Sequence, residues 1–179
     1  EHHSTTWIGD RAIETLETWE GGSHLLMASF IKPHHPFDPP APWHEMYDPG
    51  ALTLLPGWTE QVDPKDILFS KGYFPHVDLD ERKLRRIMAY YYGSISHIDH
   101  HVGRMIDTLR TRGLYDETLI VYNSDHGEYL GFHHLNGKGN RMYDPLVRVP
   151  LIVKWPGQVQ ESARRDDLVN SVDLAPTLL

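Results

Sequence analysis

The stretch LIVYNSDHGEYLGFHHLNGKG, residues 119–139, joins an apolar run to a long polar segment. Residues 119–123 have the composition of a short, fully buried strand. The residues after them are rich in histidine, acidic side chains and glycine. In open α/β sheets, ligands bind outside the carboxyl ends of the strands, and Asp125 and His126 fall at such an end. The stretch therefore predicts a buried strand that carries polar groups to a functional site.

Outward from this stretch, helical and strand patterns alternate along the chain. The longest helical pattern has apolar residues at i, i+3, i+4 and i+7 intervals, and it predicts a helix over about 80–112 that Gly113 closes. The continuous apolar run at 24–31 is typical of a buried strand. Strands connected through a helix predict an α/β fold with a mainly parallel sheet covered by helices. The other expected elements are a helix over 9–19 with Asp10 as its N-cap, a third strand over 149–155, and a helix that starts within SVDLAPTLL at 171–179.

Residues 32–80 interrupt this alternation. They hold most of the prolines of the chain, and five of these prolines cluster between positions 33 and 42. Proline removes a backbone donor and breaks helices, so the segment predicts an irregular excursion. A loop of this length in a compact domain is usually either functional or disordered.

Composition excludes several classes of protein. With 179 residues, the chain is long enough for one domain with a real core. It has no cysteine, which excludes disulfides, thiolate zinc sites and a cysteine nucleophile within these residues. The formal net charge of −8 and the lack of a basic stripe argue against a nucleic-acid partner. No segment approaches the roughly 18 apolar residues of a membrane span, and no signal peptide is visible that would indicate a compartment.

Three groups of side chains are candidates for chemistry, and each also has a plain structural interpretation. Asp125 and His126 together suit a divalent cation, although an aspartate here could equally cap a turn beside an ordinary polar histidine. Lys138 lies between two glycines, where its ammonium could hold an anionic oxygen or simply face solvent. His34 and His35 directly follow another predicted strand, and the prolines on either side of them pre-organise their loop.

The remaining histidines are more ambiguous. His133 and His134 lie together in the polar segment, where one of the pair could face solvent. His97 and His101 stand four residues apart on the long predicted helix, a spacing that could bind a metal. Because both flank the apolar stripe, the sequence favours a polar helix edge at these two positions over a metal site.

Several segments, in order along the chain, resemble the catalytic core of sulfatases within the alkaline phosphatase superfamily. The run TLIVYNSDHGEYLGFHHLNGKGNRMYDPLVRVPLIVKWPG, residues 118–157, combines a strand followed by Asp-His-Gly, a lysine thirteen residues after the aspartate, and RVPLIV. KPHHPFDPP, residues 32–40, resembles the family's segment that carries a substrate-binding histidine. DLAPTLL, residues 173–179, resembles the helix that follows the sheet. The likeness spans nearly the whole chain and implies part of an alkaline-phosphatase-like core.

The resemblance implies a role for each candidate residue. Asp125 and His126 would be metal ligands, with calcium the usual sulfatase metal and manganese the alternative that an imidazole ligand leaves open. Lys138 would bind the non-bridging oxygens of the transferring group, and His34 would hydrogen-bond that group or the leaving oxygen. His133 would add a further contact to the substrate. The implied substrate is a sulfate ester of a small molecule or a saccharide.

The sequence departs from the family pattern at the nucleophile. The family's nucleophile is a formylglycine made from cysteine or serine in a Cys/Ser-x-Pro-x-Arg motif, and neither this motif nor the two acidic metal ligands that precede it occur here. Residues 1–179 are therefore expected to be a single α/β segment of a sulfatase catalytic domain whose nucleophile lies upstream. Such a segment would be inactive alone and active in the intact protein. The alternatives are a phosphonate or phosphate monoester hydrolase of the same superfamily and a non-catalytic metal-binding domain.

Overall fold

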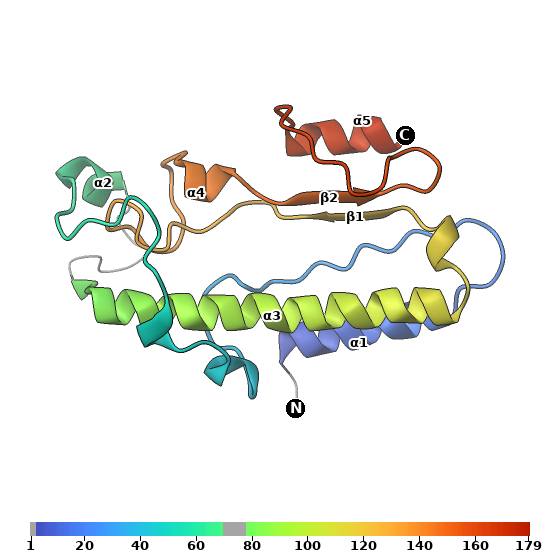
Figure 1. Ribbon diagram of the computed structural model, residues 1–179, viewed down its shortest axis with the longest axis horizontal. Coiled ribbons are helices and arrows are strands. Elements are labelled where there is room, and N and C mark those ends of the chain that lie inside the picture. Colours follow the sequence, from blue (N-terminus) through green and yellow to red (C-terminus); the bar gives the residue numbers. More distant parts are fainter. Residues whose placement is uncertain (1–2, 70–77) are drawn as a thin grey trace.

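The computed structural model describes residues 3–69 and 78–179 and is elongated along one long helix (Figure 1). That helix, α3, runs through most of the length of the molecule, with α1 along one half of it and a strand pair on its other side. The helices are α1 (Ser4–Glu17), α2 (Pro64–Phe69), α3 (Glu81–Thr111), α4 (Asp144–Val147) and α5 (Leu174–Leu178); the strands are β1 (Ile120–Asn123) and β2 (Leu151–Lys154). Short 3₁₀ turns are η1 (Trp43–Glu45), η2 (Pro49–Ala51), η4 (Tyr115–Glu117) and η5 (Ser171–Asp173).

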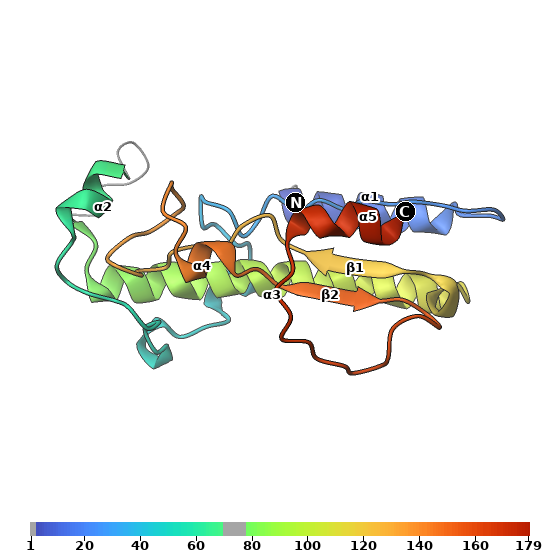
Figure 2. The ribbon, with the colours of Figure 1, turned by 90° about the horizontal axis from the view of Figure 1, so that it is seen from above.

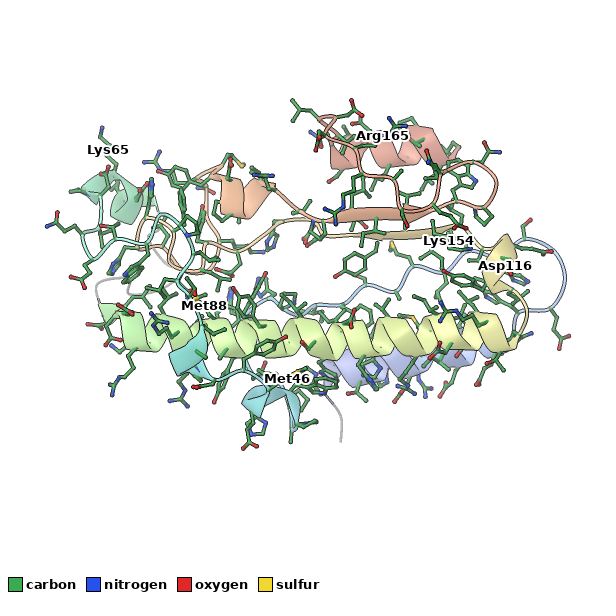
Figure 3. The ribbon with its side chains drawn as sticks, viewed as in Figure 1. Met46, Lys65, Met88, Asp116, Lys154 and Arg165 are labelled. Carbon is green, nitrogen blue, oxygen red and sulfur yellow. The ribbon has the colours of Figure 1, made fainter. Side chains whose placement is uncertain are left out.

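Helix α3 confirms the helix predicted over about 80–112. Asp80 is its N-cap, and the Asp80 carboxylate accepts a hydrogen bond of 2.7 Å from the backbone N–H of Lys83. Gly113 follows the helix with a φ of 68°, the left-handed conformation that commonly ends helices. The apolar face of α3 buries Leu84 and Met88 completely against the loops that lie above its N-terminal half (Figure 3). This packing makes α3 the support for the loops that follow β1.

Helix α1 begins earlier than the sequence predicts. It starts at Ser4 and not at residue 9, because the Nδ1 atom of His3 caps it by accepting a 3.2 Å hydrogen bond from the backbone N–H of Thr5. Asp10, the predicted N-cap, instead forms a 2.7 Å ion pair with Arg104 on α3. The two helices approach closely enough that a side chain on Gly9 would meet the His101 ring.

The prediction of a buried strand at 24–31 is wrong. Residues 23–31 are extended and run in the same direction as β1 (Figure 1), but no backbone ladder joins them to a strand within the described residues. Leu25 and Met27 are 94% and 85% exposed. The apolar composition therefore identified an extended segment, whereas burial requires partner strands that these residues do not have here.

The expectation of a mainly parallel sheet is also wrong for the described residues. Their sheet consists of β1 and β2, which pair antiparallel with Ile120 opposite Lys154 and Asn123 opposite Leu151. The chain between these strands makes loops and the short α4 helix and has no crossover helix, so it turns back and β2 runs against β1 (Figure 2). The fold is α/β in content, with helices on both sides of a small antiparallel pair.

The predicted irregular excursion is confirmed over the parts that the structure describes. Residues 32–69 contain η1, η2 and the short helix α2, which the sequence interpretation missed. The rest of the predicted excursion at 70–77 lies outside the described residues. The helix expected within 171–179 is confirmed as η5 and α5, with Asn170 as its N-terminal cap. No helix in the described part of the chain has the length and apolar character needed to cross a membrane.

His97 and His101 lie in the interface between α3 and α1 and do not form the polar helix edge predicted for them. Each is only 3% exposed, and their Nε2 atoms are 3.2 Å apart. Burial lowers the pKa of His97 to about 4, and the neighbouring His101, His3 and His100 act in the same direction. His97 therefore stays neutral in the folded protein at neutral pH.

We expect acid to destabilise the α1–α3 interface through His97. An unfolded chain protonates this histidine near pH 6.5, whereas the folded protein does so only near pH 4. Stability from the neutral ring is thus complete above about pH 6.5, falls as the pH drops toward 4, and is lost below it. Melting temperatures measured between pH 8 and 4 should fall less steeply for His97→Gln than for the wild type. His24→Gln, which replaces an exposed histidine outside the α1–α3 interface, is the control and should keep the wild-type slope.

Candidate active site

The chain leaves β1 through Asp125, His126 and Gly127. The backbone N–H of Gly127 donates to the Leu146 carbonyl at 2.7 Å, so this turn is tied to α4. Gly127 is needed for close approach, because a Cβ atom there would clash with the carbonyl oxygen of Pro145. The glycine thus allows the Asp-His pair to be held against a rigid neighbour.

The loop after this turn folds back so that Lys138 returns to the Asp-His pair. The backbone N–H of Gly131 donates to Leu135 at 2.7 Å, and that of Tyr129 donates to Gly137 at 3.1 Å. Tyr129 and Leu135 are buried and pack with Leu146 in a small core. These contacts set the position of Lys138 at the end of the loop.

His126 and Lys138 are in direct contact. The Lys138 ammonium Nζ lies 3.0 Å from Nε2 of His126, and Nδ1 of His126 lies 2.7 Å from the carbonyl oxygen of Gly127. Because a carbonyl oxygen only accepts hydrogen bonds, Nδ1 carries the ring proton and Nε2 presents its lone pair to the ammonium. Asp125 lies beside the same ring, with Oδ2 3.8 Å from Nε2.

His34 reaches the same place from the loop that follows residues 23–31. Its ring centroid is 6.2 Å from that of His126 and 4.0 Å from that of His35. Nδ1 of His34 lies 2.7 Å from the carbonyl oxygen of His35, so Nε2 is the nitrogen free to face a ligand. The structure therefore brings together His34, Asp125, His126 and Lys138, which we call the strand-end cluster.

His133 lies in a different group of side chains. Its Nδ1 atom is 3.4 Å from a carboxylate oxygen of Asp66, and its ring stacks on Phe132 with centroids 4.2 Å apart. Asp66 is buried and also accepts a 3.0 Å hydrogen bond from the hydroxyl of Tyr143. Among the contacts of the described residues, none joins His133 to Lys138. His133 thus fixes the loop to α2, and a substrate contact by this residue stays a prediction.

Two buried charges beside the strand-end cluster were not singled out from the sequence. Burial raises the pKa of Glu128 to about 7, against the opposing effects of backbone N–H groups and the Lys138 ammonium. Lys32 is 8% exposed and pairs with Asp38. Both lie inside segments that carry the candidate motifs, residues 32–40 and 118–157, so their place beside the motif histidines was the available signal. Their ionisation states contribute to the field at the cluster.

His35, next to His34, has a pKa below the usual value of a histidine. The pKa of His35 is lowered by burial and then by His34, Lys138 and Lys32. The lowered pKa disfavours the charged form of His35 beside these cations. The cluster is thus a concentrated set of donors at the end of β1.

Asp125 and His126 fit as part of a divalent metal site. The Asp125 side chain is 88% exposed, so its oxygens are accessible, and the Gly127 contact leaves Nε2 of His126 as the ring nitrogen that could bind a metal. No group of three or more histidine or acidic side chains suited to a metal occurs among residues 3–69 and 78–179. The pair could therefore supply two ligands, and a complete site would require others. Nε2 has a single lone pair, so a bound metal would replace the Lys138 hydrogen bond.

Comparisons with known proteins identify relatives of this chain. The sulfatase family model matches residues 1–179. An arylsulfatase of Clostridium perfringens is 33% identical over 187 residues, which cover 99% of this chain and 38% of the relative. The multifunctional alkaline phosphatase superfamily protein PehA of Trinickia caryophylli is 32% identical over 196 residues, covering 100% of this chain and 38% of that protein.

A solved structure is also similar to this chain in its fold. The phosphonate monoester hydrolase SpPMH from Silicibacter pomeroyi matches with a TM-score of 0.74 and 31% identity, over 87% of this chain and 33% of that one. The chain thus spans about a third of the length of its relatives. The resemblance read from the sequence is confirmed: the chain belongs to the sulfatase family, within the alkaline phosphatase superfamily.

Proposed function

We propose that the intact protein hydrolyses sulfate esters of small molecules or saccharides, with the strand-end cluster as part of its active site. The observation that carries the proposal is the contact between Lys138 and His126, with His34 beside them, from segments far apart in the chain. Sulfuryl transfer builds negative charge on the oxygens around sulfur, and preorganised cationic and N–H donors stabilise such charge. The sulfatase family match and the arylsulfatase relative support the choice of sulfate.

Each residue of the cluster has a defined part in this proposal. The Lys138 ammonium binds a non-bridging oxygen of the sulfate group as a mobile point charge. Nε2 of His34 faces the substrate, because Nδ1 is held by the His35 carbonyl, and it donates to the leaving oxygen when the ring is protonated. Asp125 and His126 hold a divalent cation, which would neutralise charge on the sulfate oxygens.

The chemistry of the two ligands is compatible with more than one divalent metal. Calcium prefers six to eight oxygen ligands, of which Asp125 supplies at most two. Imidazole nitrogen suits manganese and other transition ions as well. We propose calcium because it is the usual metal of the family that the chain resembles, with manganese as the alternative that the imidazole of His126 favours.

We place the nucleophile outside residues 1–179. The sequence has no cysteine and no Cys/Ser-x-Pro-x-Arg motif, and the sulfatase resemblance implies a formylglycine formed in such a motif. The proposed site is complete only when the segment with the nucleophile joins the strand-end cluster. Residues 1–179 alone are therefore expected to be inactive.

Hydrolysis of phosphonate or phosphate monoesters is the second candidate function. It is favoured by the match to the solved phosphonate monoester hydrolase, at 31% identity over 87% of this chain. A tetrahedral anionic phosphorus group would meet the same lysine and histidine donors. The donors of the cluster do not by themselves select sulfur over phosphorus.

A comparison of three esters tests the proposal. We expect the intact protein, supplied with calcium or manganese, to hydrolyse a nitrophenyl sulfate with a higher kcat/KM than a nitrophenyl phosphate or a nitrophenyl phosphonate monoester. Because the reaction depends on the metal, a chelator should abolish it. A higher kcat/KM for the phosphonate would establish the second candidate. Failure to hydrolyse all three would favour the non-catalytic metal-binding domain.

A further inference from the structure

Lys32 is a buried lysine with two partners at the far end of its own loop. Its ammonium donates to the carbonyl oxygen of Pro36 at 2.5 Å and to the carboxylate of Asp38. The Lys32 side chain is 8% exposed, whereas that of Asp38 is 57% exposed. The pair therefore closes the loop 33–37 across its base.

The loop that this pair closes is the one that presents His34. The backbone N–H of His34 donates to the Ile31 carbonyl at 3.3 Å, and Nδ1 of the same residue donates to the His35 carbonyl at 2.7 Å. These two hydrogen bonds of His34 are thus made to backbone within or next to the closed loop. A change in the path of this backbone would change the direction in which Nε2 of His34 points.

We propose that Lys32 and Asp38 are positioning residues, which hold the 33–37 loop so that His34 faces the substrate beside Lys138. The inference rests on the proposed function of the strand-end cluster, and it adds two residues whose side chains need not touch the substrate. Lys32 acts through the loop because its ammonium already has two protein partners. Its charge is close enough to the cluster to lower the pKa of His35, as Lys138 does.

The energetics favour a rigid connection over an incidental surface pair. A buried ammonium is costly unless it is paired and hydrogen-bonded. Opening the loop would leave Lys32 without Pro36 and Asp38, so the buried charge itself resists the opening. An exposed ion pair has no such constraint, because water replaces the lost partner. The pair between Asp107 and Arg110 on α3, with side chains 73% and 58% exposed, is an exposed pair of this kind.

The test is a double-mutant cycle in the intact protein between Asp38→Asn and His34→Ala, assayed with nitrophenyl sulfate. Asp38→Asn alone is expected to lower kcat by about tenfold to a hundredfold, with a smaller change in KM, because a misplaced donor is lost chiefly in the transition state. In the His34→Ala background the same substitution should change kcat by less than about twofold, since the residue through which it acts is absent. Asp107→Asn is the matched control and should leave kcat unchanged.

Two results would overturn the inference. One is an unchanged kcat in Asp38→Asn, and the other is an equal loss of kcat in the wild-type and His34→Ala backgrounds. Asp38 is half-exposed, so its variant is expected to fold, and melting curves check this. Asp38→Glu keeps the carboxylate and should recover part of the lost kcat.

A second measurement separates this inference from the proposed function. In ¹⁵N-histidine NMR spectra, the Nδ1–H signal of His34, assigned from the His34→Ala variant, should shift in Asp38→Asn and stay in place in Asp107→Asn. If the wild type hydrolyses no ester, the proposed function fails while the spectra still decide the positioning. A His34 signal that is the same in Asp38→Asn and the wild type would then reject the pair as a positioning device.

Discussion

Replacing Lys138 with alanine in the intact protein is expected to lower kcat for sulfate ester hydrolysis by a factor on the order of 10² or more. The ammonium lies 3.0 Å from Nε2 of His126 and is the cationic side chain that the loop delivers to the strand-end cluster. Its removal takes away a charge aimed at the oxygens on which negative charge develops. The loss should appear in kcat and in kcat/KM alike, since the interaction is strongest in the transition state.

Lys65→Ala is the matched control for this prediction. Lys65 is exposed on α2 and points outward (Figure 3), so its removal changes the net charge equally without touching the cluster. It should leave kcat unchanged. The melting temperature of Lys138→Ala should stay close to that of the wild type, because a partly exposed loop lysine buries little surface. Wild-type turnover by this variant would make Lys138 an ordinary loop residue.

The parts of the fold that depend on local sequence were predicted well. Helix α3 was placed within one residue at each end, because its apolar period and its caps at Asp80 and Gly113 lie within the segment itself. The start of α1 was missed because His3, which is not among the preferred N-cap residues, caps it. Asp10 had the right chemistry for a cap, but its charge is used in the ion pair with Arg104.

The parts that depend on distant partners could not be predicted. Residues 24–31 have the composition of a buried strand, and the segment is extended, yet the strands that would bury Leu25 and Met27 are not specified by these residues. The direction of β2 relative to β1 was likewise inferred from a general rule for crossover connections. The actual connection contains no crossover helix, so the rule did not apply.

The grouping of the candidate residues was predicted better than the sheet around them. His34, Asp125, His126 and Lys138 lie close together, although residues 24–31 before His34 are not a paired strand, and the roles of these residues stay predictions. The buried charges that support them, such as Lys32, were missed because their burial depends on the three-dimensional packing. A lysine beside a proline looks solvated in a sequence, and only its contact with Asp38 shows otherwise.

His126→Ala is expected to cause a loss of turnover even larger than that of Lys138→Ala, on the order of 10³, because it removes a proposed metal ligand. A metal that stabilises several kcal/mol of transition-state charge accounts for a loss of this size. The variant protein, purified and analysed by elemental mass spectrometry, should retain less metal per chain than the wild type. The exposed His100→Ala variant is the control, and its metal content and turnover should match those of the wild type.

The metal content also separates two ways in which His126 could act. Nε2 of His126 accepts a hydrogen bond from Lys138, so the histidine could serve chiefly to hold that ammonium in place. In that case the His126→Ala protein would keep its metal. The double variant His126→Ala/Lys138→Ala would then be no less active than His126→Ala alone. If His126 is a ligand, His126→Ala loses metal, and a chelator lowers its residual activity little further. Lys138→Ala should bind the metal at least as tightly as the wild type, because the competitor for the single Nε2 lone pair has been removed.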